Sequence, residues 1–498
     1  MTVDSALQNH AEWQPSKAAV RTADRSITYA ELNASVTCLA RYLLDRGLRP
    51  GDRVAVHWSN SIETVQLLLA VFRAGLVAVP INLRLTAPEI AYIFEHSSTR
   101  VCFSEPVLAA VAEEARSGSD PEILTQFPAT KTTPGPLPEV DPAQPAVILY
   151  TSGTTARPKG VAHTQRSLFE TALLWTSVPI DPDDTVLAMA QLMHALGLGL
   201  VLTALQQGAT AILLRTFDPA AALDLIERFR CTQIFGLPAM LQFVVEEQAR
   251  RPRDVSSMRF AGAGGDSVPA ALQQRFQDVF AIPLREGYGL TESSPVAFIP
   301  SMDVRAGSIG PAAPGVSIRL VDLLGHDVAA GETGEILVRS PANCVGYWND
   351  PVATTCLFDD RWLRTGDLAL CDEDGYYWFK GRIKQLIIRG GSNISPQEVE
   401  EALHQHPAVL EAGVIGAPHQ VYGEVPVAGV VLRAGHSLSE EQLRVHVGTH
   451  LADYKVPDRI FFLAELPKSL TGKVDRRRLR DILIAQPDFL KQHVISGV

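Results

Sequence analysis

Two spacings of hydrophobic positions alternate along the first hundred residues. A helical spacing of three to four residues runs from Leu32 to Leu44, behind a capping box of Thr28 and Glu31. A second helix of the same kind is predicted for 62–72. Short apolar runs with the character of buried strands occupy 53–58, 76–82 and 100–103. This alternation of strand and helix predicts a mainly parallel sheet with helices on both faces.

The pattern changes further along the chain. Segment 115–145 is rich in Pro, Ser, Thr and Glu and predicts a surface connection. Strand-like runs then resume at 146–151, 185–190, 209–214, 232–237 and 259–264. Short strands and Asp-Gly turns predict a β-rich subdomain at about 305–381. We therefore expect an α/β protein with a large N-terminal domain, residues 1–383, and a small α+β C-terminal domain, residues 384–498.

Composition places the chain among large globular proteins. Of its 498 residues, 46% are hydrophobic and 20% are charged, so apolar burial can offset the entropy of ordering a large core. Lys and Arg number 44 against 55 Asp and Glu, and this net charge of −11 disfavours non-specific binding to nucleic acid or anionic lipid. The basic run 473–480 lacks interleaved aromatic residues and is predicted to be a solvated helix face.

The sequence also predicts a cellular compartment. The six cysteines are scattered and show no CxxC pair or metal-ligand spacing, which favours a reduced, cytoplasmic environment. The N-terminus has no basic region followed by an apolar region, as a secretion signal would. The longest uncharged apolar run, 195–205, is too short to span a bilayer. We expect a cytoplasmic protein without a membrane span.

The strongest local motif is YTSGTTARPKGV at 150–161. It predicts a strand that enters a loop of small and hydroxylic residues and ends near the cation Lys159, a combination suited to a polyphosphate. The spacing of Gly, Lys and Ser/Thr excludes the common GxxxxGK[ST] nucleotide loop. The residues predicted to hold phosphate with Lys159 are Thr151, Ser152, Gly153, Thr154 and Thr155.

This string resembles the phosphate loop of the adenylate-forming superfamily, which contains acyl-CoA and aryl-CoA synthetases, luciferases and nonribosomal adenylation domains. Further family signatures follow in the family's order and cover almost the whole chain. They are MHALGL (193–198), GLPAML (236–241), FAGAGG (260–265), GYGLTE (287–292), TGD (365–367), GRIKQLIIRGGSNISPQEVE (381–400) and PKSLTGKVDRRRL (467–479). One departure is Ala156, where the family usually has Gly.

The resemblance implies ATP-dependent activation of a carboxylic acid with Mg²⁺, followed by transfer to coenzyme A. It implies that Glu292 holds Mg²⁺, that Thr291 touches the α-phosphate and that Tyr288 lies against the adenine. Asp367 and Arg382 would bind the ribose. Four glycines would leave space beside the nucleotide and acyl group: Gly264, Gly265, Gly287 and Gly289.

The resemblance also implies a moving C-terminal lid, residues 384–498, with its hinge at Lys384. The lid would bring Lys473 to the reacting carboxylate and phosphate for adenylation. A second orientation would bring Gly390 and Gly391 to the pantetheine for thioester formation. The pivot must absorb a large backbone change, which a solvated lysine tolerates.

The motif MHALGL favours the acid–CoA ligase branch. His194 stands where amino-acid-activating members have an aromatic residue followed by an Asp that pairs with the substrate ammonium, and by resemblance its ring flanks the substrate carboxylate. The expected acyl pocket is mainly apolar, without an obvious cation for a second carboxylate, and is lined by His194, Phe235, Gly236, Gly264, Gly287 and Leu290. Medium-chain, alicyclic and aryl acids all fit this description.

Two other functions stay open at this point. One is an acyl-AMP ligase that loads a carrier protein, and the other is an inactive nucleotide-binding homologue. Presence of all the key charged residues argues against an inactive homologue: Lys159, Glu292, Asp367, Arg382 and Lys473. The string GGDS at 264–267 resembles a carrier-protein serine site, but we interpret it as a Gly-rich loop whose Asp266 and Ser267 cap the next helix. The oligomeric state is not predicted.

Overall fold

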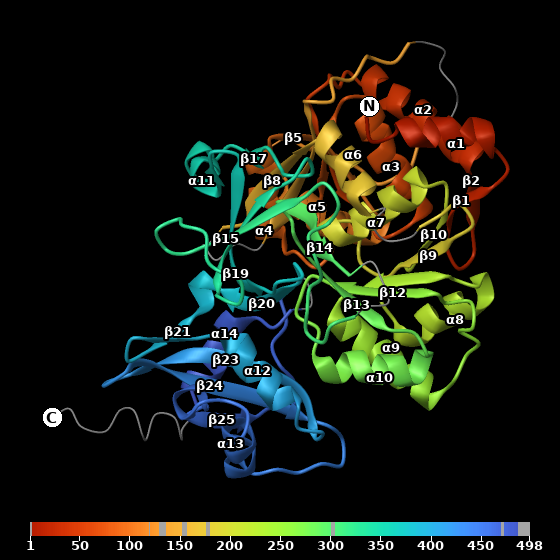
Figure 1. Ribbon diagram of the computed structural model, residues 1–498. Coiled ribbons are helices and arrows are strands. Elements are labelled where there is room, and N and C mark those ends of the chain that lie inside the picture. The colour runs from red at the N-terminus through yellow and green to blue at the C-terminus, as the bar shows by residue number, and fades with distance from the viewer. Residues whose placement is uncertain are drawn as a thin grey trace.

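The computed structural model describes residues 2–118, 120–128, 136–151, 157–175, 180–299, 304–469 and 473–486. Two large sheets, a five-stranded β-rich sheet and a C-terminal domain follow one another roughly in chain order (Figure 1). Among the described residues, no helix combines the length and apolar character that crossing a membrane requires.

The first large sheet has seven strands in the order β17-β8-β7-β4-β3-β5-β6; the strands from β7 to β6 are parallel, and β8 pairs antiparallel with β7 and β17. Its strands are β3 (Arg53–His57), β4 (Val77–Pro80), β5 (Thr99–Ser104), β6 (Glu122–Leu124), β7 (Pro145–Thr151), β8 (Lys159–Thr164) and β17 (Gly346–Tyr347). The segment 115–145 thus contributes a strand, β6, which pairs with β5, and is not only a surface connection.

The second large sheet has eight strands in the order β14-β13-β12-β11-β9-β10-β1-β2. Its strands are β1 (Ala18–Arg21), β2 (Ser26–Thr28), β9 (Thr185–Ala188), β10 (Thr210–Leu213), β11 (Gln233–Gly236), β12 (Phe260–Gly264), β13 (Leu284–Leu290) and β14 (Ser293–Phe298). Four of these strands, β9 to β12, were predicted from apolar runs; β1, β2, β13 and β14 were not.

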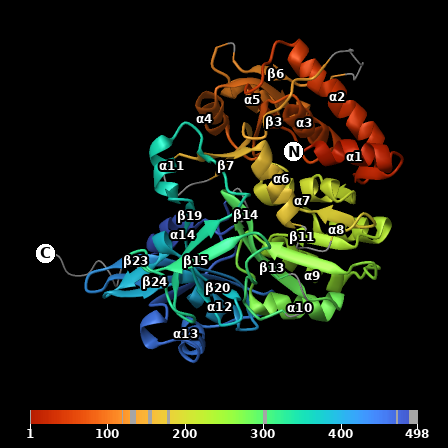
Figure 2. The same cartoon turned by 45° about the horizontal axis from the view of Figure 1, so that its top comes forward.

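Helices form three layers around these two sheets (Figure 2). Between the sheets lie α2 (Tyr29–Asp45), α3 (Ile62–Arg73), α6 (Gln165–Leu174) and α7 (Ala195–Gln206), whose apolar residues share one core with both sheets. The outer faces are covered by α4 (Ala87–Ser97) and α5 (Ala109–Ala115) on one side, and by α8 (Pro219–Phe229), α9 (Pro238–Arg250) and α10 (Ala270–Phe280) on the other. Helix α1 (Ser5–Trp13) packs on α2.

Local sequence signals account for the helix starts and the strand faces. The capping box predicted for α2 is present: the Glu31 amide donates to Thr28 Oγ1 at 3.2 Å, and the Thr28 amide donates to Glu31 Oε2 at 2.9 Å. In β3, Val54 and Val56 face the central core and Ala55 faces the outer helices, as the period of a strand requires.

The β-rich sheet and the C-terminal domain complete the chain. The sheet contains β15 (Ser317–Val321), β16 (Gly334–Arg339), β18 (Phe358–Asp359), β19 (Trp362–Cys371) and β20 (Tyr377–Arg382), with α11 (Pro351–Leu357) beside it. The C-terminal domain contains β21 (Ile387–Arg389), β22 (Ser392–Ile394), β23 (Val409–His419), β24 (Gly423–Leu432), β25 (Arg459–Phe462), α12 (Pro396–His404), α13 (Glu440–Gly448) and α14 (Arg476–Ile484). It has a core of its own.

Candidate active site

A large cleft of about 2640 Å³ lies where the two large sheets, the β-rich sheet and the C-terminal domain meet. Strand ends and their loops form its walls, which is the usual place for a ligand site in α/β proteins. Most of the described residues expected from the sequence line it. They are Thr151, Lys159, His194, Gly264, Gly265, Gly287, Tyr288, Gly289, Leu290, Thr291, Glu292, Asp367, Arg382, Lys384 and Lys473. Ser152, Gly153, Thr154 and Thr155 lie outside the described residues, as does Ala156.

Asp367 is a buried carboxylate with both oxygens engaged. The register of β19 and β20 places Asp367 opposite Arg382, whose Nε lies 3.0 Å from Asp367 Oδ1. The Tyr288 hydroxyl donates to Asp367 Oδ2 at 2.7 Å. Burial raises the pKa of Asp367, and Arg382 and Tyr288 oppose this rise. Strands β13, β19 and β20 therefore bring the Asp367 carboxylate, a hydrogen-bond acceptor, and the Arg382 guanidinium, a donor, close together. A pair of ribose hydroxyls requires both kinds of group.

Thr291 and Glu292 form the turn between β13 and β14. The Tyr347 hydroxyl donates to Glu292 Oε1 at 2.8 Å, and the Tyr347 ring lies 4.5 Å from Lys159 Nζ. Burial, then the Glu292 carboxylate, raises the pKa of Tyr347. Tyr347 was missed by the sequence analysis because it is 55 residues from Glu292, on a two-residue strand without a motif.

The side chains around Glu292 suit a magnesium ion that arrives with a nucleotide. Among the described residues, no group of three His, Cys, Asp or Glu side chains is arranged to hold a metal. Glu292 is a single carboxylate that shares the cleft with Lys159 and Thr151. Magnesium commonly binds one or two carboxylates together with substrate phosphates, so these residues fit a magnesium nucleotide rather than a resident metal.

His194 stands immediately before α7 and faces the cleft. Burial lowers its pKa to about 4, with further contributions from Lys473 and Arg84, so the ring is neutral near pH 7. Its loop is held by Asn60, whose amide donates to Ala190 and Leu214 carbonyls at 3.1 and 3.2 Å. Neither Asn60 nor Arg84 carries a motif that would have revealed it.

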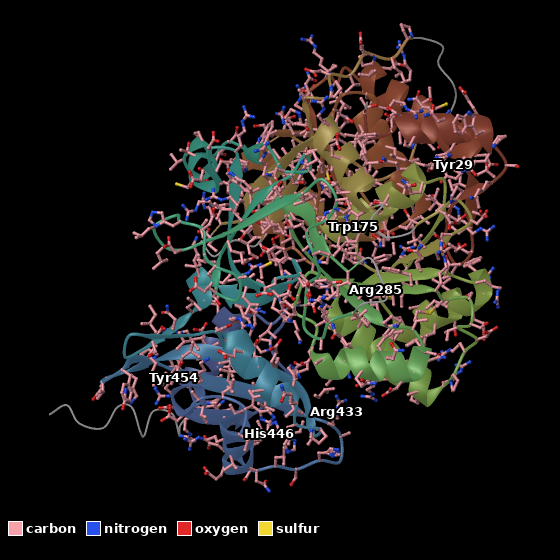
Figure 3. The ribbon with its side chains drawn as sticks, viewed as in Figure 1. Tyr29, Trp175, Arg285, Arg433, His446 and Tyr454 are labelled. Carbon is pink, nitrogen blue, oxygen red and sulfur yellow. The ribbon has the colours of Figure 1, made fainter. Side chains whose placement is uncertain are left out.

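Phe235 and Gly236 do not reach the cleft wall, contrary to the expectation for the acyl pocket. The Phe235 ring stacks on Phe260 at 5.4 Å and meets the edge of Trp175 at 5.8 Å. Trp175 lies in the middle of the large domain, and with Phe298 it lines the cleft in place of Phe235 (Figure 3). The period of β11 turns Phe235 into the core.

The C-terminal domain presents Lys473 to this cleft. Burial lowers the pKa of Lys473, while the nearby carboxylates Asp266 and Asp367 act to raise it. The domain also contacts the large domain through Arg433, whose guanidinium lies 3.3 Å from Glu246 (Figure 3). This orientation is the one expected for adenylation.

Gly390 and Gly391 lie away from the cleft in this orientation. They form the exposed turn between β21 and β22, with φ of +55° and +87°. A side chain at Gly391 would meet no atom within 4 Å. In this orientation the C-terminal domain presents Lys473 to the cleft, and Gly390 and Gly391 do not line it.

The loop at 264–267 differs from a second expectation, which was that Asp266 and Ser267 cap the next helix. Helix α10 begins at Ala270 with Pro269 before it, and no side chain caps its first turn. Asp266 accepts from the amide of Ser267 at 3.0 Å, so neither residue caps the helix.

Comparison with known proteins gives one consistent family. A model of the AMP-binding enzymes matches residues 7–348, and a model of the AMP-binding enzyme C-terminal domain matches residues 398–473. The chain is 35% identical to an indoleacetate–CoA ligase of Aromatoleum aromaticum, over 99% of this chain and 100% of the relative. It is also 35% identical to a fatty acid–[acyl-carrier-protein] ligase of Streptomyces coeruleorubidus, over 95% of this chain and 94% of the relative. An anthranilate CoA ligase solved with anthranoyl-AMP superposes with a TM-score of 0.92 at 29% identity, over 97% of each chain.

Proposed function

The chain belongs to the family of AMP-binding enzymes, and we propose that it is an ATP-dependent carboxylic acid–CoA ligase. The observation that supports this best is the convergence of Asp367, Glu292 and Lys473 on one cleft, although they come from three different parts of the chain. A homologue without catalytic activity would not need these three charged side chains in one cleft.

In the first half-reaction a carboxylate oxygen of the acid attacks the α-phosphorus of ATP. The new bond gives an acyl-adenylate, and the bond to the β-phosphate breaks as pyrophosphate leaves. Two anions must meet, so the ammonium of Lys473 stabilises charge that grows in the transition state. The ribose would be held by Asp367 and Arg382, and the α-phosphate by Thr291. Magnesium, held by Glu292 and the phosphates, would supply further positive charge.

In the second half-reaction the thiolate of coenzyme A attacks the acyl carbon, and the bond to AMP breaks. No protein nucleophile is required. The lid would rotate about Lys384, which is exposed beside the cleft, and bring Gly390 and Gly391 to the thiol path. The neutral ring of His194 suits a position beside the reacting carboxylate, because it adds no net charge there.

We propose an aromatic acid as the substrate class. The cleft wall contains Trp175, Phe298 and Leu290, with the rings of Phe235 and Phe260 packed behind them. The relatives named for indoleacetate and anthranilate act on aromatic acids by their names. Such a wall favours a flat ring over a polar group.

A panel assay tests both parts of this proposal. The purified chain is incubated with ATP, Mg²⁺, coenzyme A and one acid at a time from aromatic, medium-chain, alicyclic and dicarboxylic classes, and AMP and thioester are measured. We expect acid-dependent AMP release with an aromatic acid and coenzyme A. Activity with a holo carrier protein but not with coenzyme A would favour carrier loading instead, and preference for a dicarboxylic acid would assign Arg84 to a second carboxylate.

A further inference from the structure

His163 is a buried histidine that no step of the proposed reaction uses. It lies on β8, which begins at Lys159, and its side chain is only 4% exposed. Its Nε2 lies 2.7 Å from the carbonyl oxygen of Thr291, and its Nδ1 lies 3.2 Å from Ser167 Oγ. A carbonyl oxygen only accepts, so Nε2 carries the hydrogen and Nδ1 faces the serine hydroxyl as an acceptor; that hydroxyl also lies 3.2 Å from the carbonyl oxygen of Thr164. A single neutral tautomer therefore satisfies both ring nitrogens.

The acceptor of this bond belongs to the turn of Thr291 and Glu292. The amide of Cys344 donates to the Glu292 carbonyl at 2.8 Å, and the Tyr347 hydroxyl donates to the Glu292 carboxylate. Both of these contacts are made to Glu292. The His163 ring instead donates to the carbonyl oxygen of Thr291, and this bond orients the peptide group that joins Thr291 to Glu292.

We propose that His163 is a positioning residue that fixes the Thr291–Glu292 turn, so that the Thr291 hydroxyl and the Glu292 carboxylate face the phosphates of ATP. The inference rests on the proposed function, which assigns this turn to the nucleotide. Strand β8 would then link both sides of the phosphate site, because Lys159 at its start also lines the cleft. Partners that orient a ligating side chain typically change affinity or activity by about 10–100-fold when removed.

The chain offers a matched control two residues away. Gln165 is also buried, and its amide donates at 2.8 Å to the carbonyl of Phe72, in α3 rather than in the turn. Gln165→Leu removes a buried hydrogen bond to a carbonyl, and His163→Leu removes one of the same kind together with the contact to Ser167. We expect both variants to lose thermal stability. Only His163→Leu should alter the nucleotide site.

The test measures binding of a non-hydrolysable ATP analogue by calorimetry across a magnesium titration. We expect His163→Leu to weaken analogue binding and to raise the magnesium midpoint by about 10–100-fold, with Gln165→Leu near the wild type. Equal affinities in the two leucine variants would overturn the proposal. Because the readout is binding, it decides the role of His163 whether or not the wild type proves to be a CoA ligase.

A second pair of variants decides the question if His163→Leu does not fold. The amide nitrogen of glutamine reaches about as far as Nε2 of histidine, and that of asparagine only about as far as Nδ1. His163→Gln should therefore keep the bond to Thr291 and bind the analogue better than His163→Asn. Equal weakening by both, or loss of affinity for the acid as well as for ATP, would assign His163 to general packing.

Discussion

The charge of Lys473 offers the sharpest test of the proposed chemistry. Lys473→Ala removes the ammonium that the C-terminal domain brings near Asp266 and Asp367. Asp367 keeps its bonds to Arg382 and Tyr288, so the ribose site should survive the change. The variant should bind ATP while it fails to join the acid to it.

The expected magnitude follows from the position of the ammonium. Two unit charges about 4 Å apart interact by about 4 kcal/mol at an effective dielectric constant near 20. Each 1.36 kcal/mol of transition-state stabilisation is worth a factor of about ten in rate. Loss of Lys473 should therefore slow adenylation by about 10²–10³-fold, as measured for single oxyanion donors in other enzymes.

The assay separates the two half-reactions. Acid-dependent exchange of pyrophosphate into ATP reports adenylation, and thioester yield from supplied acyl-adenylate reports the second step. A matched control is Lys468→Ala, which removes a lysine of the same domain that pairs with Glu411 at 2.8 Å, and should leave exchange near the wild type. Equal loss of both half-reactions in Lys473→Ala would show a structural lysine and refute the reasoning.

The pH dependence gives an independent check. Burial lowers the pKa of Lys473 below its ordinary value of 10.5, and the protonated form is the active one. Exchange by the wild type should thus be fully present at lower pH and be lost as pH rises through this lowered pKa. Lys473→Ala should lack that alkaline limb.

Three further variants test other parts of the site. Glu292→Gln should raise the magnesium midpoint of pyrophosphate exchange by about tenfold, because a metal-binding charge is lost; an unchanged titration would reject that role. Gly391→Trp should block thioester formation and spare exchange, whereas Gly435→Trp, in an equally open turn with φ of +81°, should spare both; equal effects would indicate lid misfolding. Asp367→Asn should weaken AMP binding by about 10–100-fold in calorimetry, because a charged acceptor is lost, and unaltered affinity would remove Asp367 from the ribose site.

The sequence by itself determined the local elements and the chemistry of the motif residues. The helix at 29–45 begins where its capping box stands, because capping bonds join residues three positions apart. Asp367 and Arg382 are paired across a hairpin, and the Asp-Gly turn of this hairpin can be recognised in the sequence. Interactions of short range depend on neighbours in sequence, so they can be predicted without the fold.

Tertiary structure alone decided which side chains face the cleft and what supports them. Phe235 directly precedes the motif at 236–241 and was expected in the acyl pocket, yet its strand turns it into the core and Trp175 lines the cleft. His163 and Tyr347 reach the Thr291–Glu292 turn from 128 and 55 residues away. Gly391 lies outside because the domain orientation presents Lys473. The packing of whole sheets and domains determines such contacts. The residues that take part in them have no neighbouring sequence pattern that would predict the contact.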